Sequence, residues 1–278
     1  MYDVSYIYLY GFFMIVELSD FFNNPSLIEI GPLKIQYYAV TWLLSAIFIY
    51  LFLKSNQIMI ELGLNHEKVN DLVFMYGLFI GSMCGGRFGY MVFYGTEQLI
   101  SNPLSLFYIW QGGLSFHGGL VGVVISFLVF SKRNNISFLR LMDGAALAMP
   151  IGLGLVRIGN FLNGELYGKE TNGDWGFIFP TDPFGLLRHP SQLYESFGEG
   201  ILLFILLYWI NKLTKIHGVV CSSFLILYGL IRFIIEFFRQ PDSHIGYVFL
   251  ESLSMGQILC VPMIAIGFIM LFYSRKTS

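Results

Sequence analysis

Charged residues are scarce in this sequence, and their scarcity is the first guide to the kind of protein it encodes. Asp, Glu, Lys and Arg make up only 12% of the 278 residues, whereas hydrophobic residues make up 55% and the mean hydropathy is +0.65. A soluble core of this size does not bury so much apolar surface, so lipid must be the solvent for much of it. The net charge of -2 and the lack of a basic run argue against nucleic acid as a partner.

Cysteine is also sparse, and its placement excludes two further classes of protein. Cys84, Cys221 and Cys260 lie inside apolar stretches, and the sequence has no C-x-x-C pair and no histidine cluster at metal-ligand spacing. This pattern indicates neither a disulfide framework nor a zinc site. We therefore expect no metal and no other cofactor.

The first twenty residues lack the features of a cleaved leader. They have no basic n-region and no small-residue cleavage site, and acidic residues flank an apolar stretch that is too short to span a membrane. We interpret residues 1-30 as an N-terminal interfacial segment, with an interfacial helix from Tyr6 to Leu18.

Seven apolar stretches are long enough to cross a bilayer. A membrane-spanning helix needs roughly 20 mostly apolar residues, because each residue advances the helix by about 1.5 Å. We therefore predict an all-α polytopic membrane protein with seven transmembrane helices. The windows lie near residues 37-53, 69-94, 118-131, 141-162, 192-211, 218-238 and 254-273.

The distribution of basic residues among the connections predicts the orientation. By the positive-inside rule, the C-terminus and the short lysine-bearing loops face the cytoplasm. With seven spans, the N-terminus and the loops near 95-117, 163-191 and 239-253 then face outward. Six or eight spans would put half of these loops on the wrong side, so the parity supports the count.

One outward connection differs in composition from the rest. Residues 164-190 are rich in glycine and proline and interrupt a mixed polar and aromatic run, which is typical of an external loop or small cap. The sequence contains no internal repeat and no low-complexity tract. We predict a single membrane domain, 1-278, with an extracytoplasmic insert at 164-190.

Four charged side chains fall within predicted spans, where an ionised group costs about 3 kcal/mol or more unless it is paired or hydrated. Counted along each helix, all four lie in the outer half of the membrane, and a histidine and a tyrosine at the ends of two spans lie at the same level. Guanidinium forks suit phosphate oxygens, so this convergence indicates an anion site open to lipid. The residues are Arg87, Arg157, Arg232, Glu236, His117 and Tyr38.

Helical spacing groups some of these side chains, but each also has a simpler interpretation. Tyr228, Arg232, Glu236 and Arg239 form one stripe on the sixth span. A buried structural ion pair is the simpler alternative for Arg232 and Glu236. The remaining simpler interpretations are a capping role for His117, an aromatic belt for Tyr38 and Trp110, and interhelical hydrogen bonds for Asn160 and Asn163.

Five motifs in fixed order carry a resemblance to a known family. The longest, R-I-G-N-F-L-N-G-E-L-Y-G, runs from Arg157 to Gly168. Together the motifs resemble the bacterial prolipoprotein diacylglyceryl transferases, and the match extends over nearly the whole chain from about Ile30. The other four are G-G-R-F-G-Y (85-90), W-Q-G-G-L-S-F-H-G-G (110-119), R-H-P-S-Q-L-Y-E (188-195) and Y-G-L-I-R-F-I-I-E-F-F-R-Q-P-D (228-242).

The resemblance implies a seven-helix enzyme of the bacterial inner membrane, with its N-terminus outside and its active site facing the outer leaflet. Its substrates would be phosphatidylglycerol and prolipoprotein signal peptides with a lipobox cysteine, and membrane lipid would surround it. Near Tyr38 the family often has His-Trp-Tyr where this chain has Gln36, Tyr37 and Tyr38, so a histidine function there is absent or replaced. The residues that the resemblance ties to function are Tyr38, His117, Arg157, Asn160, Glu165, Gly168, Arg232 and Glu236.

The reaction implied by the resemblance joins a cysteine sulfur to the glyceryl carbon that bears phosphate, and releases glycerol phosphate. We assign Arg157 and Arg232 to the phosphate, with Glu236 orienting Arg232. His117 is the candidate base, because an imidazole is partly neutral near pH 7, and Tyr38 or Glu165 are alternatives. The expected substrate-binding residues are Arg157, Asn160, Asn163, Gly168, Arg87, Tyr228, Arg232 and Arg239.

Other membrane functions fit the sequence less well. A seven-helix transporter or receptor is the main alternative, but a transporter would carry charges through both leaflets and a retinal protein would have a lysine in the last span. An intramembrane serine protease would need Gly-x-Ser-Gly, and Ser115 stands in G-L-S-F. A CDP-alcohol phosphotransferase would need several intramembrane aspartates at metal spacing, and Asp143 stands alone.

Overall fold

The computed structural model describes residues 26-30, 33-171, 175-241, 247-249 and 253-276. The predicted interfacial helix from Tyr6 to Leu18 lies outside the described residues. The chain divides into two compact units, one formed by Met1–Ile49 with Ala146–Ser278 and the other by Tyr50–Ala145. We call them the bundle unit and the hairpin unit.

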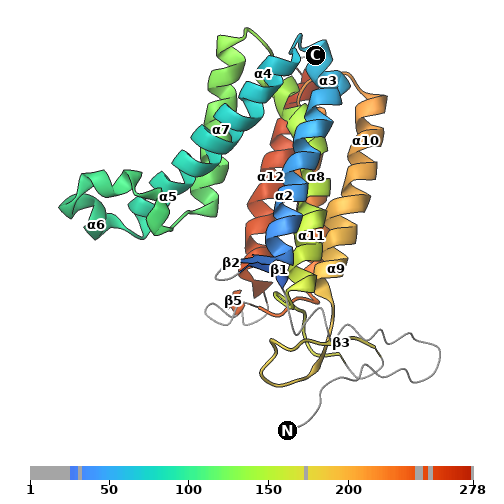
Figure 1. Cartoon of the computed structure of the whole chain (residues 1–278). Coiled ribbons are helices and arrows are strands. Elements are labelled where there is room, and N and C mark those ends of the chain that lie inside the picture. The colour runs from blue at the N-terminus through green and yellow to red at the C-terminus, as the bar shows by residue number, and fades with distance from the viewer. Residues whose placement is uncertain (1–25, 31–32, 172–174, 242–246, 250–252, 277–278) are drawn as a thin grey trace. The chain divides into compact units, whose positions relative to one another are not determined.

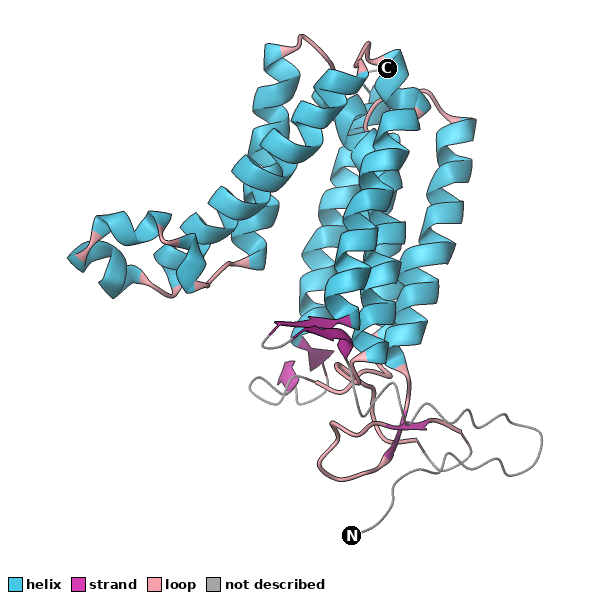
Figure 2. Cartoon of the chain, in the orientation of Figure 1, coloured by secondary structure: helices cyan, strands magenta, loops and turns pink. Residues whose placement is uncertain are grey.

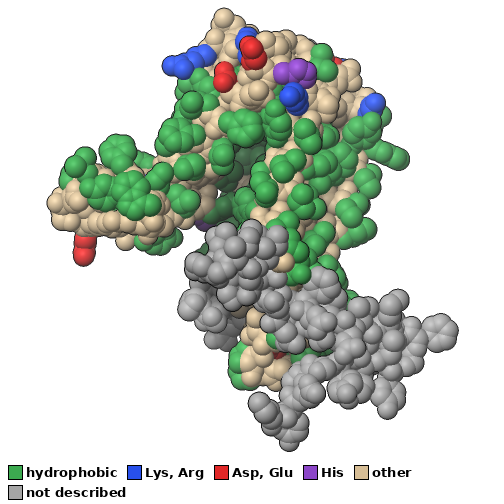
Figure 3. Space-filling view, viewed as in Figure 1, with side chains coloured by type: hydrophobic (Ala, Val, Ile, Leu, Met, Phe, Trp, Pro, Cys, Tyr) green, Lys and Arg blue, Asp and Glu red, His purple; other side chains and the backbone are tan. Residues whose placement is uncertain are grey.

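The bundle unit consists of long helices that run side by side (Figure 1). Their surfaces are apolar because the helices have hydrophobic residues on most sides, as lipid-facing helices do. Figure 3 shows hydrophobic side chains along the flanks of the helices on the visible face, with Lys, Arg, Asp and Glu at helix ends. The bundle helices are α2 (Tyr37–Ser55), α8 (Phe138–Leu162), α9 (Ser191–Glu195) continuing through η4 (Ser196–Leu202) into α10 (Leu203–Leu213), α11 (Val219–Ile235) and α12 (Met255–Lys276).

Two bundle contacts depend on the absence of a side chain. A Cβ on Gly159 of α8 would lie 3.2 Å from the Cα of Tyr38 in α2, and a Cβ on Gly154 would lie 3.1 Å from the Cα of Gly200 in η4. The hydroxyl of Ser45 in α2 also donates to the carbonyl of Gly152, at 3.0 Å. Small residues therefore bring α2 and η4 against α8, which is how membrane helices pack without a hydrophobic driving force.

In the described part of the chain, three short antiparallel ladders accompany the helices (Figure 2). The first joins β1 (Ser26–Ile30) to β2 (Leu33–Gln36), directly before α2. The second joins β3 (Phe177–Ile178) to β4 (Leu187–Arg188) within the predicted insert, and the third joins β5 (Tyr247–Phe249) to β6 (Leu253–Ser254), directly before α12. The described part of the insert at 164-190 is thus a loop that contains one short antiparallel ladder.

The hairpin unit is built around two long helical arms. Its first arm is continuous from α4 (His66–Asn70) through π-helical η1 (Asp71–Cys84) to α5 (Gly85–Phe93), and its second arm is α7 (Phe116–Arg133). The arms meet at glycines, since a Cβ on Gly118 would lie 2.9 Å from the Cα of Gly89. Short helices complete the unit: α3 (Gln57–Glu61), α6 (Thr96–Ser101), η2 (Pro103–Phe107) and η3 (Ile109–Gln111).

The helices confirm an all-α polytopic membrane protein. Within the described residues, six helices are long and apolar enough to cross a bilayer: Tyr37–Ser55, His66–Phe93, Phe116–Arg133, Phe138–Leu162, Ser191–Leu213 and Met255–Lys276. The remaining predicted span, 218-238, corresponds to α11, a shorter apolar helix of 17 residues. At 1.5 Å per residue α11 is about 26 Å long, close to the thickness of a hydrocarbon core.

Candidate active site

A cluster of arginines and glutamates lies inside the bundle unit. Glu195, Glu199 and Glu236 are buried, the first two with 0% of their surface exposed. Arg157 from α8, Arg232 from α11 and Arg239 beyond the end of α11 face these carboxylates. We call these six residues the arginine-carboxylate cluster.

One carboxylate joins all three arginines. Glu195 Oε2 lies 2.7 Å from Arg157 Nε, and Glu195 Oε1 lies 3.1 Å from the NH1 nitrogen of Arg232 and 3.2 Å from that of Arg239. Buried charges persist only where the geometry and hydrogen bonding are good, and removing one partner leaves the others uncompensated. Glu195 is therefore the central residue of the cluster.

Arg232 in turn joins all three carboxylates. Its NH1 nitrogen lies 3.3 Å from Glu199 Oε1 as well as 3.1 Å from Glu195, and its NH2 nitrogen lies 2.8 Å from Glu236 Oε2. The hydroxyl of Ser254 donates to Glu236 Oε1 at 3.0 Å. Arg232 and Glu236 do form the i, i+4 ion pair expected from their spacing, but the pair is part of a larger network.

The arginines keep donors for a ligand. Arg157 Nε lies 2.7 Å from Glu195 Oε2 in an ion pair, and Arg157 Nη1 donates to Asn160 Oδ1 at 3.4 Å. Among the described residues, the Arg157 guanidinium donates no other hydrogen bond to protein, although it has five N–H groups. The Arg157 side chain is 18% exposed, so these donors are reachable. A planar fork of free N–H groups beside a second guanidinium can bind a phosphate.

The end of α8 and the turn that follows it carry four of the predicted site residues. Asn160 is buried beside Arg157, and the carbonyl of Asn160 accepts from the N–H of Glu165 at 2.9 Å. The Asn163 amide donates to Glu165 Oε1 at 2.8 Å, although Glu165 itself is exposed. The backbone N–H of Gly168 donates to the carbonyl of His189, at 2.8 Å.

Gly168 has a packing reason to be glycine. A Cβ there would lie 2.5 Å from the carbonyl oxygen of Phe238 and 2.7 Å from that of His189, both of them backbone atoms that cannot move aside cheaply. Gly168 also pairs with Arg239 in an isolated β-bridge. A residue with a side chain at this position would displace the backbone that leads to Arg239.

Two tyrosines of the predicted site lie on bundle helices. Tyr228 is one turn before Arg232 on α11, and its ring stacks on Phe224 with centroids 5.6 Å apart. Tyr38 lies in the first turn of α2, where its carbonyl accepts from the hydroxyl of Thr41 and its ring meets Trp42 edge to face. Both tyrosines are only partly buried.

The insert contains a closed ion pair that the predicted site did not include. Arg188 Nε and NH2 donate to Asp182 Oδ2 and Oδ1 at 2.8 and 3.0 Å, which is a two-point contact. The hydrogen bonds from Arg188 hold the pKa of Asp182 below its ordinary value, and the same contact raises the pKa of Arg188. This pair fastens the loop that contains β3 and β4.

His189 lies among aromatic rings rather than charges. Its ring contacts Trp175, Tyr194 and Phe238, and its Nδ1 is 3.1 Å from the hydroxyl of Tyr194. Burial lowers the pKa of His189, because water no longer solvates the charged imidazole. A neutral ring in this position supports the turn that begins α9 and so carries Glu195.

In the hairpin unit, the guanidinium of Arg87 donates its hydrogen bonds to backbone carbonyls. It is 3% exposed, and its guanidinium donates to the carbonyls of Ser105 (2.7 Å), Leu106 (3.3 Å), Gly112 and Gly113 (3.4 Å). These contacts hold residues 105-113 against α5. The predicted role of Arg87 in substrate binding stays a prediction, but its geometry is that of a residue that positions this loop.

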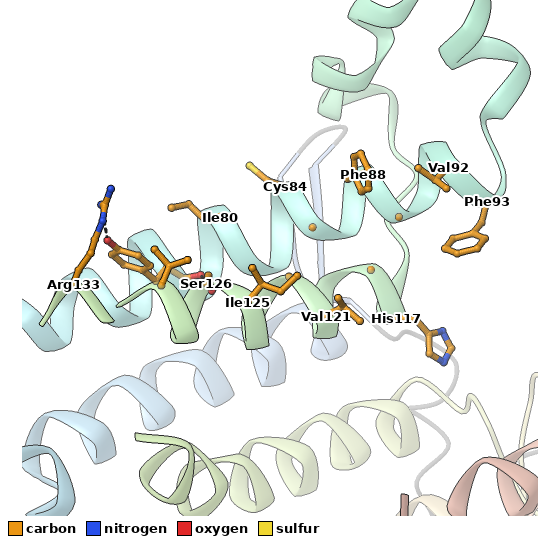
Figure 4. A pocket seen from close by; sticks show the side chains of 16 residues that line it. Ile80, Cys84, Phe88, Val92, Phe93, His117, Val121, Ile125, Ser126 and Arg133 are labelled. Atoms are coloured by element: carbon orange, nitrogen blue, oxygen red, sulfur yellow. Dashed lines mark hydrogen bonds between the residues drawn. The ribbon is translucent and has the colours of Figure 1, made fainter. Parts of the chain in front are cut away.

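His117 is exposed at the start of α7, where Ser115 caps the helix by accepting from the N–H of Gly118. His117 lines one end of a groove of about 790 Å³ along the two arms of the hairpin unit, and Arg133 lies at the other end (Figure 4). The groove walls are apolar, and Figure 4 shows them formed by Ile80, Phe88, Val92, Val121 and Ile125 among others.

The sequence interpretation missed Glu195 and Glu199. Both fall within the predicted span 192-211. The rule that singled out Arg157 and Glu236 was the presence of an ionisable residue inside a span, and the same rule would have found these two glutamates. Their spacing of four residues places both on one helix face. Glu195 is, in addition, the last residue of the motif R-H-P-S-Q-L-Y-E.

The fold and the site together define a polytopic membrane protein with a buried cluster suited to an anionic headgroup. Residues 25–273 match the family described as prolipoprotein diacylglyceryl transferase. The chain is 44% identical over 259 residues to the phosphatidylglycerol–prolipoprotein diacylglyceryl transferase of Pseudomonas entomophila, covering 92% of this chain and 96% of that protein.

Proteins with the same description in a strain of Pseudomonas putida and in Ectopseudomonas mendocina are 45% and 43% identical, over 92% and 91% of this chain and 96% and 94% of theirs. The chain therefore belongs to the prolipoprotein diacylglyceryl transferase family, and the resemblance found in the sequence motifs is confirmed.

Proposed function

We propose that this protein transfers the diacylglyceryl group of phosphatidylglycerol to the lipobox cysteine of prolipoproteins. The observation that carries the proposal is the arginine-carboxylate cluster, in which Arg157 has few protein hydrogen bonds and shares Glu195 with Arg232 inside an apolar helix bundle. Family membership supplies the reaction. A phosphodiester headgroup is the ligand that such paired guanidinium forks bind best.

The chemistry requires stabilisation of the leaving group. The cysteine sulfur attacks the glyceryl carbon that bears phosphate, a C–S bond forms, the C–O bond breaks, and glycerol phosphate leaves. Negative charge grows on the phosphate oxygens in the transition state, so fixed donors that face them lower the barrier. We assign this role to Arg157 and Arg232, with Glu236 orienting Arg232 and Arg239 binding through the same network.

The remaining predicted residues have supporting roles in the proposal. Asn160, Asn163, Gly168 and Tyr228 bind or frame the headgroup, and residues 164-190 receive the peptide. His117 accepts the thiol proton, because a neutral imidazole is a suitable base near pH 7. Tyr38 and Glu165 are the alternative bases. We propose that Arg87 acts by positioning residues 105-113 rather than by touching the lipid.

We also propose seven spans in the bacterial inner membrane, with the N-terminus and the insert outside, the C-terminus in the cytoplasm and the active site facing the outer leaflet. The length of α11, about 26 Å, and the basic residues at the end of α12 support this arrangement. Phosphatidylglycerol would then enter from the surrounding lipid.

The test is transfer of labelled diacylglyceryl from phosphatidylglycerol to a lipobox peptide by the purified protein in detergent. We expect transfer by the wild type, none to a peptide with serine in place of cysteine, and a loss of about 100-fold or more in Arg157→Ala, since one donor to a developing anion is worth that much. Arg157→Lys should also fail, because it keeps the charge but loses the fork.

Arg133→Ala is the matched control, since it removes an exposed arginine from the far end of the hairpin unit. His117→Gln tests the base, with an expected loss of about 100-fold or more. Activity that survives in His117→Gln would move that role to Tyr38 or Glu165. If folded wild type binds lipid but transfers nothing, the proposal fails and a transporter or receptor takes its place.

A further inference from the structure

With every side chain in its ordinary charged form, the described residues of the arginine-carboxylate cluster carry equal numbers of positive and negative charges. Among the described residues it contains three guanidiniums, on Arg157, Arg232 and Arg239, and three carboxylates. The arginines cannot lose their protons. A phosphodiester headgroup that binds here adds one negative charge to a low-dielectric site, where an uncompensated charge is costly. Uptake of a proton by one carboxylate would offset this added charge.

The three carboxylates differ in how firmly they are held as anions. Glu195 has contacts of 2.7, 3.1 and 3.2 Å to three arginines, and Glu236 has 2.8 and 3.0 Å contacts to Arg232 and Ser254. Glu199 has a single contact of 3.3 Å, to Arg232. Its Oε2 has neither a hydrogen bond nor an ion pair among the described residues, whereas the Oε2 atoms of Glu195 and Glu236, which also lack a hydrogen bond, lie 2.7 and 2.8 Å from arginine nitrogens. Glu199 is therefore the carboxylate that is cheapest to protonate.

We propose that Glu199 takes up a proton when the arginine-carboxylate cluster binds the anionic lipid headgroup, so that binding strengthens as the pH falls. The inference rests on the proposed function, because it needs a phosphodiester at the arginines. When the arginines compensate the charge of the phosphate, they compensate the charge of Glu199 less, and a proton on Glu199 makes up the difference. Glu199 thereby contributes to the affinity of the enzyme for its lipid substrate.

The groups that face Glu199 explain why its charge responds to the ligand. Burial disfavours the Glu199 anion most strongly, Arg232 from α11 and Arg157 from α8 attract the anion, and Glu195 from α9 repels it. Tyr228 from α11 and Cys260 from α12 also interact with it electrostatically. Once phosphate occupies the two arginines, their attraction for Glu199 is partly cancelled while the repulsion from Glu195 remains. Ligand binding thus favours the protonated form.

The experiment is equilibrium binding of radiolabelled phosphatidylglycerol to the purified full-length protein in detergent, without peptide, from about pH 6 to pH 9. For the wild type we expect the Kd to rise with pH, by up to about tenfold per pH unit, which is the limit for one exchanged proton. Glu199→Gln carries no charge at this position at any pH. We expect it to bind more tightly than wild type at high pH and to lose the pH dependence.

Two controls test whether proton uptake by Glu199 is the cause of the pH-dependent Kd. Glu97→Gln neutralises an exposed glutamate of α6 and should keep the pH dependence of the wild type. Diacylglycerol, which lacks the phosphate, should show a pH-independent Kd. Proton uptake by wild type can also be measured directly, by calorimetry of the binding reaction in buffers of different ionisation enthalpy, and this requires no variant to fold.

The outcomes distinguish this inference from the proposed function. Uptake of about one proton by wild type, lost in Glu199→Gln, supports the inference. A flat Kd with no proton uptake in wild type overturns it, as does a Glu199→Gln variant that keeps the slope, and neither result affects the transfer assay. A wild type that binds lipid with the expected pH dependence but transfers nothing would instead overturn the proposed function.

Discussion

The charged residues of this protein act in groups, because a charge in an apolar bundle is stable only when opposite charges pair with it. Glu195 contacts three arginines and Arg232 contacts three glutamates, so the loss of either breaks several pairs at once. By contrast, Asp182 and Arg188 form a closed pair in the insert, with a two-point contact. The two arrangements suit different roles: the shared network keeps free donors for a ligand, and the closed pair stabilises a loop.

The Asp182 pair gives the insert a predictable response to acid. Hydrogen bonds from Arg188 hold the pKa of Asp182 below its unfolded value, so the stabilisation is present above the unfolded pKa and is lost as the pH falls through the folded pKa. We expect Asp182→Asn to lower the melting temperature at neutral pH and to flatten its decline on acidification. Thermal melting from pH 7 to acid conditions checks both.

The expected loss in Asp182→Asn is about 3 kcal/mol, because Arg188 would be left buried without its anion. Glu97→Gln is the control, with a melting curve like that of the wild type, since Glu97 is exposed. An Asp182→Asn variant with an unchanged melting temperature and the same acid response would show that the pair does not stabilise the insert.

At the scale of elements, glycine decides which helices touch. Gly154 of α8 faces Gly200 and the carbonyl of Ser196 in η4, at 3.1 and 3.2 Å from a Cβ built on Gly154. This approach places η4, which carries Glu199, and the preceding helix end, which carries Glu195, against Arg157. In the hairpin unit, Gly85, Gly89 and Gly118 bring the two arms together in the same way.

We therefore expect Gly154→Val to separate η4 from α8 and to weaken the contact between Glu195 and Arg157. Overpacking of this kind costs about 1–3 kcal/mol of stability, while a small displacement of the arginines should lower kcat/KM by about 100-fold. The transfer assay and thermal melting, made on the same sample, check both numbers. Ile158→Leu changes a lipid-exposed position of α8 and should leave both unchanged. Full activity in a folded Gly154→Val variant would contradict the proposed helix contact.

At the scale of the whole molecule, the question is which side of the membrane each connection faces. Seven spans place the loop around Lys215 in the cytoplasm and the loop around Gln240 outside, whereas a chain in which α11 does not cross would place both on one side. The two arrangements therefore differ at residues only 25 positions apart in sequence.

Cysteine labelling in intact cells tests this difference. After replacement of Cys84, Cys221 and Cys260 by alanine, we expect an impermeant maleimide to label a cysteine at Gln240 directly and a cysteine at Lys215 only after permeabilisation. Transfer activity of each variant controls for folding. Labelling of both positions from the same side would contradict seven spans.

Much of the fold was predictable from the sequence, for a physical reason. Lipid cannot hydrogen-bond to a backbone, so long apolar stretches must be helices, and hydropathy alone located those at Tyr37–Ser55, Phe138–Leu162 and Met255–Lys276 to within a few residues. The short ladder between β3 and β4 was not predicted, because strands of two residues carry no periodic pattern.

The candidate site was predicted only in part. Arg157, Arg232 and Glu236 were found because charges within spans are conspicuous, and the structure brings them together in one network. Glu195 and Glu199 obey the same rule and were overlooked. Arg87 obeys it too, yet in the structure this residue of α5 donates to backbone carbonyls of residues 105-113. Hydropathy reports how deep a charge lies, not which group it pairs with.

The sequence by itself determined the membrane class, the approximate spans and the family, because these depend on composition, on periodicity and on local motifs. Only the tertiary structure decided that Glu195 contacts three arginines and that Arg87 fastens residues 105-113. It also decided that, among the described residues, Glu199 has one ion-pair contact, to Arg232, and an Oε2 without a hydrogen-bond partner. Each of these facts depends on distances of 3 Å or so between residues far apart in the chain. Such distances are fixed by helix packing at glycines, which no local pattern encodes.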